Sequence, residues 1–175
     1  MTEFQTQKAA KPTPEEMINQ LVKAEHRQTA LDFIAHIRAI KMTPSWASIN
    51  SWKCSYKSKG VVYIKIDSNG DWWLQPFTQR DMHLKALVAD EPDEIKAYVE
   101  QHLGRYTPCG GCMPGLDRHT VNQEWKNICA VYSLNMKNPD DGLCEFAKRL
   151  IMLRRDAVAC GRVPKCNYVK PGDRV

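Results

Sequence analysis

The chain has 175 residues, which at roughly 150 residues per domain corresponds to one domain and excludes a multidomain machine. Hydrophobic residues make up 43% and charged residues 26%, as is ordinary for a globular protein, and no apolar run is long enough to span a bilayer. The formal net charge of +5 is small. We therefore expect a small molecule or a protein as the partner, and neither nucleic acid nor a membrane.

Residues 1–12 are polar and show no periodicity, so a disordered tail is predicted there. This polar start lacks the apolar region of a secretory signal, and the number of cysteines, seven, is odd; both features favour a cytoplasmic protein. We expect one domain over residues 13–161, which includes a cysteine-rich loop over residues 105–118. A basic tail over residues 162–175 follows it.

A helix is predicted to begin at Thr13-Pro14-Glu15-Glu16, which combines a capping threonine, a proline at the first helical position and a glutamate that completes a capping box. Apolar residues then recur at helical spacing from Met17 to Ile40. Residues 26–29 interrupt this stripe, so one bent helix and two short helices both fit. Pro44 excludes a continuation.

Three strands are predicted after this helical segment. Apolar and polar side chains alternate over residues 51–57, and two further strand-like runs cover residues 61–66 and 72–77. Short Ser-Lys-Gly and Ser-Asn-Gly connections separate the runs, which predicts a three-stranded antiparallel meander. Because Trp72 and Trp73 are neighbours in the third run, their side chains must point to opposite faces of the sheet.

Three helices are predicted to follow the sheet. The first begins at the acidic residues 91–94 and continues to Gly104, and the third begins at residues 138–141 and ends at Gly161. The second begins at Thr120, with a strand as its alternative. The fold class is therefore α+β: a three-stranded antiparallel sheet with an N-terminal helical segment and three following helices.

The most specific local signal is the pair Cys109 and Cys112, because two cysteines separated by two residues can direct both sulfurs at one metal ion. Cys129 and Cys144 can supply the remaining two thiolates of a tetrahedral site. We therefore expect a structural zinc ion bound by Cys109, Cys112, Cys129 and Cys144. Four protein ligands leave no open position for a substrate, which fits a domain that is not an enzyme.

Two other interpretations of these cysteines stay open. Cys109 could be a redox nucleophile that Cys112 resolves, although the pair does not follow a strand as in thioredoxin-like sites. Cys129 and Cys144 could instead be core residues on the apolar faces of their helices, and Cys144 lies next to such a stripe. Cys166 is a further possible fourth ligand. Cys54 alternates with aromatic residues on an apolar strand face, and we assign it to the core.

Tryptophans are the second unusual feature, since four of the five lie in or near the predicted sheet. Aromatic side chains on a sheet can line a concave pocket for a flat ligand, and Trp52, Trp72 and Trp73 are the candidates for such a small-molecule sensor. The alternative is that these side chains pack a helix onto the sheet.

No pattern typical of acid–base or nucleophilic catalysis is found in the sequence. The five histidines are scattered, no serine lies in a nucleophile elbow and no glycine-rich phosphate loop follows a strand. We therefore predict no catalytic residues and expect a ligand- or partner-binding domain.

The stretch Asn50-Ser51-Trp52-Lys53-Cys54-Ser55-Tyr56-Lys57, followed by Val62-Tyr63-Ile64 and by Trp73 to Pro76, resembles the sheet core of the YdhG-like group of small uncharacterised bacterial proteins. These proteins carry a similar Trp-x-x-x-Tyr-Lys strand, a second strand, and a third strand that ends near a proline. The resemblance implies an α+β fold with helices behind an antiparallel sheet, in a group sometimes described as iron-chaperone-like. It covers roughly a third of the chain and implies no catalytic residue.

Overall fold

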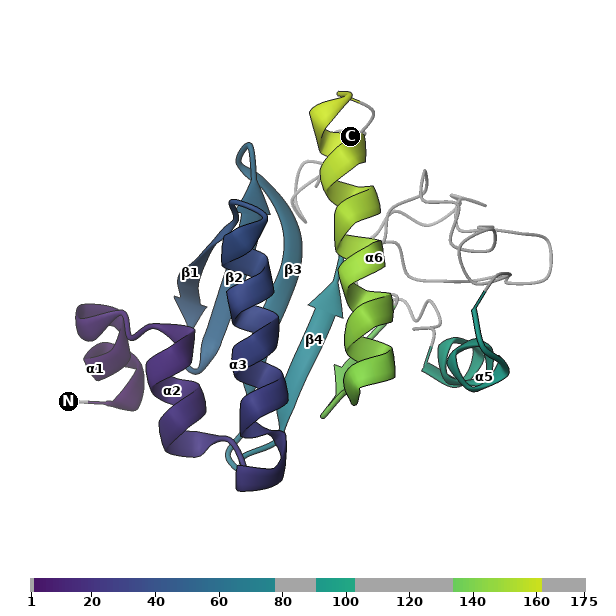
Figure 1. Cartoon of the computed structure of the whole chain (residues 1–175). Helices are drawn as coiled ribbons and strands as arrows, with labels where there is room; N and C mark the ends of the chain where they lie inside the picture. Colours follow the sequence, from purple (N-terminus) through teal and green to yellow (C-terminus); the bar gives the residue numbers. More distant parts are fainter. Residues whose placement is uncertain (1, 78–90, 103–133, 162–175) are drawn as a thin grey trace, which may run out of the picture.

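The structure, a computed structural model, describes residues 2–77, 91–102 and 134–161. Its helices are α1 (Glu3–Ala10), α2 (Pro14–Leu21), α3 (Ala24–Ala39), α5 (Asp93–His102) and α6 (Asp141–Ala159). Its strands are β1 (Thr43–Ser48), β2 (Ser51–Tyr56), β3 (Lys59–Ile66), β4 (Trp72–Pro76) and β5 (Met136–Lys137). The predicted α+β class is confirmed, and Figure 1 shows α2, α3 and α6 packed across the sheet.

The sheet has five antiparallel strands in the order β1-β2-β3-β4-β5. The three predicted strands are its centre, β2 to β4, and the structure adds β1 and β5 at the two edges. The sequence pattern does not reveal β1, because Pro44 and three small polar residues hide its alternation, although proline is tolerated at a sheet edge. Strand β5 has two residues, which is too few to produce a pattern.

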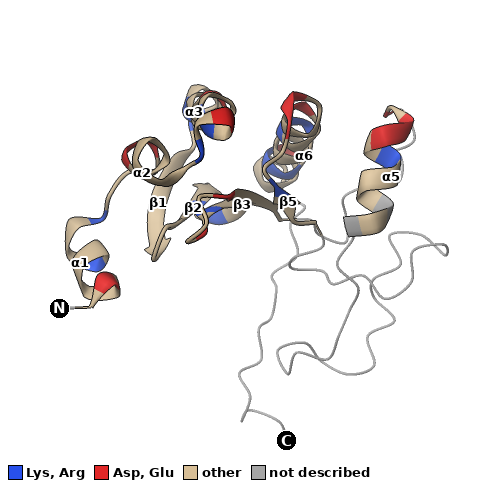
Figure 2. Ribbon diagram, turned by 90° about the horizontal axis from the view of Figure 1, so that it is seen from below, with Lys and Arg blue, Asp and Glu red and all other residues tan. Residues whose placement is uncertain are grey.

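The two faces of the sheet differ in what covers them. Helices α2, α3 and α6 pack on one face, which carries buried residues such as Trp52, Ile64 and Leu74. Figure 2 shows these helices on one side of the strands and α1 beside the β1 edge, and no helix of the described residues covers the other side. Half-buried polar and aromatic side chains occupy that other face, which we call the uncovered face.

In place of the disordered tail expected for residues 1–12, the structure has helix α1. Thr2 and Gln5 form a capping box at its start, and the Gln7 side chain is buried against Asn50 at the turn between β1 and β2. A polar residue that finds a partner 43 positions away leaves no local pattern, so the docking of this helix could not be predicted.

The helical segment from Thr13 consists of two helices, one of the two open alternatives. The predicted capping box of Thr13 and Glu16 is confirmed at the start of α2. The chain breaks at Val22 and Lys23, earlier than the interruption at residues 26–29, because Val22 takes an extended conformation. The Lys23 backbone amide donates to the Gly70 carbonyl instead of continuing the helix.

The later helices follow the prediction where the structure describes them. Helix α5 begins at the acidic residues as expected, and the Asp140 side chain caps α6 by accepting a hydrogen bond from the Leu143 amide. Gly161 follows α6 with a positive φ of 69°, which suits a residue without a side chain at a helix end. The predicted helix from Thr120, the loop over 105–118 and the tail over 162–175 lie outside the described residues.

None of the helices in the described part of the chain has the length and apolar character that crossing a bilayer requires.

Candidate functional site

Trp72 and Trp73 point to opposite faces of β4, as predicted. Trp72 is fully buried on the helix-covered face, where its ring meets that of Phe33 at a centroid distance of 6.0 Å. Trp52 is buried on the same face, and its Nε1 donates to the Pro12 carbonyl at 2.8 Å. Trp52 and Trp72 therefore pack helices onto the sheet, and of the three candidate tryptophans Trp73 alone reaches the uncovered face.

Trp73 forms one wall of a groove on the uncovered face with a volume of about 450 Å³. The groove lies where the β1–β2 turn and the end of β3 meet β4. Its lining residues are Ser48, Ile49, Asn50, Ser51, Lys65, Ile66, Asp67, Trp73 and Gln75. This volume falls within the roughly 300–1,000 Å³ of known small-molecule sites.

A cross-strand row of residues forms the floor of the groove and continues beyond Trp73. Ser51 pairs with Lys65, Lys65 with Trp73, and Trp73 with Lys137. The Lys137 ammonium lies 5.4 Å from the centre of the Trp73 ring, which is a favourable cation–π distance. Because Lys137 is on β5 and the groove is on the β3 side, the cation and the groove flank Trp73 on opposite sides.

Asp67 holds the edge of the Trp73 ring. Its Oδ2 accepts a hydrogen bond from the indole Nε1 at 3.3 Å, and its Oδ1 accepts from the backbone amides of Asn69 and Asp71. Burial opposes ionisation of this carboxyl, but the three hydrogen bonds outweigh it and lower the pKa of Asp67. The carboxylate is therefore ionised at neutral pH and fixes the orientation of the indole.

Two polar side chains of the groove keep unused bonding capacity. The Gln75 Oε1 is buried and accepts no hydrogen bond from any residue that the structure describes. Lys65 forms no ion pair within the same part of the chain. A buried acceptor without a donor is unfavourable. The groove therefore offers a cation beside an aromatic ring, and the Gln75 side chain adds an acceptor that is buried at its edge.

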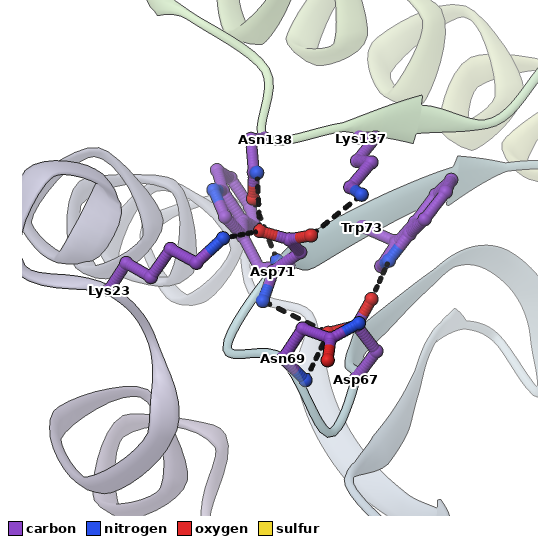
Figure 3. Close-up of polar contacts among 8 residues, drawn as sticks. Lys23, Asp67, Asn69, Asp71, Trp73, Lys137 and Asn138 are labelled. Atoms are coloured by element: carbon purple, nitrogen blue, oxygen red, sulfur yellow. Dashed lines mark hydrogen bonds and ion pairs between the residues drawn. The ribbon is translucent and has the colours of Figure 1, made fainter.

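Asp71, directly before β4, connects this strand to β5 and to the start of α3 (Figure 3). Its carboxylate accepts hydrogen bonds from the ammonium groups of Lys23 at 2.5 Å and Lys137 at 2.6 Å. It also accepts one from the side-chain amide of Asn138 at 2.9 Å. These bonds, with that of Lys137 first, lower the pKa of Asp71 well below its usual range. Asn138 also accepts from the Trp72 amide, so the cluster fixes β4 against β5 and against the start of α3.

The wall of the groove opposite Trp73 is held by α1. Asn50 lines the groove, and Gln7 accepts a hydrogen bond from its backbone amide at 2.9 Å and donates one to its side chain at 2.7 Å. Asn50 has a positive φ of 47°, a conformation that asparagine tolerates better than most residues. Helix α1 therefore determines the shape of this wall.

The cysteines of the expected zinc site are described only in part. Cys109, Cys112, Cys129 and Cys166 lie outside the described residues. Cys144 lies in the hydrophobic core at 4% exposure and donates to the Pro139 carbonyl, and burial raises the pKa of its thiol to about 12. This environment favours the packing alternative for Cys144. No cluster of three or more metal-binding side chains occurs among residues 2–77, 91–102 and 134–161.

Cys54 is buried in the core, as assigned from the sequence, and burial raises the pKa of its thiol to about 12.

Sequence reasoning identified Trp73 but missed its neighbours Lys65, Asp67 and Gln75. The available signal was the alternation itself, because every second residue of β3 and β4 opposite the apolar face belongs to the uncovered face. That the polar side chains line a hollow depends on cross-strand register, which the sequence does not give.

Comparisons with protein-family models, with curated proteins and with solved structures gave no match for this chain. The resemblance of its strands to the YdhG-like group stays a prediction.

Proposed function

We propose that this protein is a binding domain that holds a planar, negatively charged small molecule in the groove beside Trp73. The observation that carries this proposal is the position of the Trp73 indole, which is half-buried and forms a wall of a hollow on the uncovered face. An aromatic ring held in this way offers a flat apolar surface at little entropic loss, since Asp67 and Lys137 already fix it.

The chemistry of the groove indicates the class of ligand. A planar ring would stack on Trp73 and an anionic group would meet Lys65, while an N–H group on the edge of the ring would donate to Gln75 Oε1 once that side chain turns toward the ligand. Both Asp67 oxygens already accept hydrogen bonds from protein groups, and its negative charge favours a position of the anionic group on the Lys65 side of the groove. A heteroaromatic ring with a phosphate or carboxylate group combines the flat ring, the N–H donor and the anion.

Tryptophan fluorescence tests this proposal. We expect nucleoside monophosphates or heteroaromatic carboxylates to quench the emission of the native protein in a saturable manner. The Trp73→Phe variant should lose the quenching, whereas Trp72→Phe, which removes an indole from the opposite face, should keep it once far-UV circular dichroism shows that it is folded. Quenching that persists in Trp73→Phe would refute the proposal. So would the absence of quenching by every nucleoside monophosphate and every heteroaromatic carboxylate tested.

A structural zinc ion is a second proposal, supported by the Cys-x-x-Cys spacing of Cys109 and Cys112. A site completed by Cys129 and Cys144 requires a thiolate at Cys144, which its buried position disfavours. Metal analysis of protein purified without chelator tests the proposal, and a stoichiometry near zero would exclude it. The Cys144→Ala variant tests the fourth ligand, since retained zinc would transfer that role to another residue such as Cys166.

A further inference from the structure

Positive charge gathers on the two strands that form most of the uncovered face. Between Ser51 and Ile66 the chain has four lysines and no acidic residue, and two of these lysines, Lys53 and Lys65, lie on the uncovered face. The Asp67 carboxylate follows directly and lines the groove beside Lys65. The expectation against nucleic acid is based on the small net charge of the whole chain. That value includes acidic residues in other parts of the sequence and so hides the positive charge of this region.

The two lysines of the uncovered face are spaced along it. Lys65 is paired with Ser51, and Lys53 lies two positions further along β2, which is roughly 7 Å. Lys53 is outside the lining of the groove, so a ligand that reaches both lysines extends beyond the groove. Lys57 does not belong to this row, because its ammonium lies 5.7 Å from the centre of the Tyr56 ring, which Arg155 of α6 also contacts. A polymer with repeated negative charges fits two cations spaced in this way.

Two features leave these lysines available to a ligand. Neither Lys53 nor Lys65 forms an ion pair with another described residue. The stem of Lys53 crosses the face over Gly60, where the Cβ atom of any larger residue would lie only 2.9 Å from the Lys53 Cε. The missing side chain at Gly60 therefore lets Lys53 lie flat against β3.

We infer that the uncovered face binds single-stranded nucleic acid, with one base stacked on Trp73 and successive phosphates on Lys65 and Lys53. This inference rests on the proposed function, since the base occupies the groove. Aromatic stacking combined with a cationic track is the usual basis of single-strand binding without strong sequence preference. A duplex is excluded as the preferred ligand, because its bases are stacked on one another and cannot lie against Trp73.

Fluorescence anisotropy with fluorescein-labelled 12-nucleotide oligouridylate and oligothymidylate tests the inference on the full chain. We expect either or both to bind more tightly than a 12-base-pair duplex, and more tightly than uridine monophosphate measured by competition. Trp73→Ala should weaken binding roughly tenfold, as the loss of stacking on one aromatic residue predicts. The double variant Lys53→Gln/Lys65→Gln should reduce the slope of log affinity against log salt by about 1.4, or about 0.7 for each lost phosphate contact.

The matched control is Lys8→Gln/Lys41→Gln, which removes the same charge from exposed lysines outside the sheet. Equal weakening by both double variants would overturn the inference, since charge alone would then explain binding. Equal affinity for the duplex and the single strand would also overturn it. If uridine monophosphate quenches Trp73 while the oligonucleotides bind no more tightly, the inference fails and the proposed function stands. If neither quenches nor binds, both fail.

Discussion

Gln7 and Asn50 are joined by two hydrogen bonds that attach helix α1 to the turn between β1 and β2. The Asn50 amide donates to Gln7 Oε1 at 2.9 Å, and Gln7 Nε2 donates to Asn50 Oδ1 at 2.7 Å. Both residues are 8% exposed. The Phe4 ring also packs against that of Trp46 on β1 at a centroid distance of 5.8 Å. Helix α1 thus supports a wall of the candidate groove, which links the N-terminal segment to the site.

Replacement of Gln7 by alanine is expected to release α1. The change leaves the Asn50 amide without its acceptor, so the free energy of unfolding should fall by about 1–2 kcal/mol. Hydrogen exchange should accelerate over residues 3–10, and urea unfolding measures the loss of stability. Gln28→Ala is the matched control, since Gln28, on the exposed surface of α3, bonds to Asp32 and to no other side chain among the described residues. An equal effect of the two substitutions would contradict this role of Gln7.

The central strands and the larger helices could be predicted because their signals are local. The alternation around Trp52 and the capping box at Thr13 can each be recognised within a short run of consecutive residues. Thr2 and Gln5 give a similar local signal for helix α1, but its docking and the walls of the groove could not be predicted, because Gln7, Lys65 and Gln75 take their roles from partners in other elements. Whether a tryptophan packs the core or lines a pocket could not be predicted for the same reason. Trp72 and Trp73 are neighbours of the same residue type, and only the position of the helices decides which of the two faces is buried.

Asp71 is expected to make stability depend on pH in the acid range. Its pKa is lowered in the folded state, so the charged form stabilises the fold above the ordinary carboxyl pKa of about 4, and this contribution is lost progressively as the pH falls below that value. Asp71→Asn should lower the melting temperature at pH 7, because it leaves Lys23 and Lys137 without their counter-ion. It should also make the decrease in stability between about pH 5 and about pH 2.5 shallower, which urea unfolding at each pH measures.

Asp93→Asn provides the comparison for this experiment, since the Asp93 side chain is 99% exposed and pairs only with Lys96 in its own helix. It should leave the melting temperature and the acid profile unchanged. An acid profile of Asp71→Asn that follows the native one would show that the Asp71 cluster does not stabilise the fold.

Trp72 and Trp73 are expected to respond differently to the same substitution. Trp72→Phe removes volume from a fully buried position and should lower the free energy of unfolding by about 1–2 kcal/mol. Trp73→Phe acts on a half-buried ring and removes its hydrogen bond to Asp67, so it should lower the free energy of unfolding by less, about 0.5–1 kcal/mol. Urea unfolding followed by circular dichroism measures both. A loss in Trp73→Phe as large as in Trp72→Phe would mean that Trp73 belongs to the core rather than to a binding surface.

The described cysteines are expected to fall into two classes of reactivity. Cys160 is exposed at the end of α6 and should react readily with iodoacetamide at about pH 8. Cys54 and Cys144 are buried with thiol pKa values of about 12, so at this pH each should hold about a thousandfold less thiolate than an ordinary cysteine. Peptide mass spectrometry after a short pulse of reagent gives the rate at each site. Rapid labelling of Cys54 or Cys144 in the folded protein would contradict their burial.

The same experiment separates the zinc and redox proposals for Cys109 and Cys112. Zinc-bound thiolates should be protected until a chelator is added, whereas a redox nucleophile at Cys109 should react faster than Cys160 without chelator. Cys54 serves as the internal control, because its protection comes from burial and should not change with chelator. If chelator exposes Cys144 together with the pair, Cys144 is a ligand; if Cys144 stays protected, it is a core residue and the zinc proposal requires a different fourth donor.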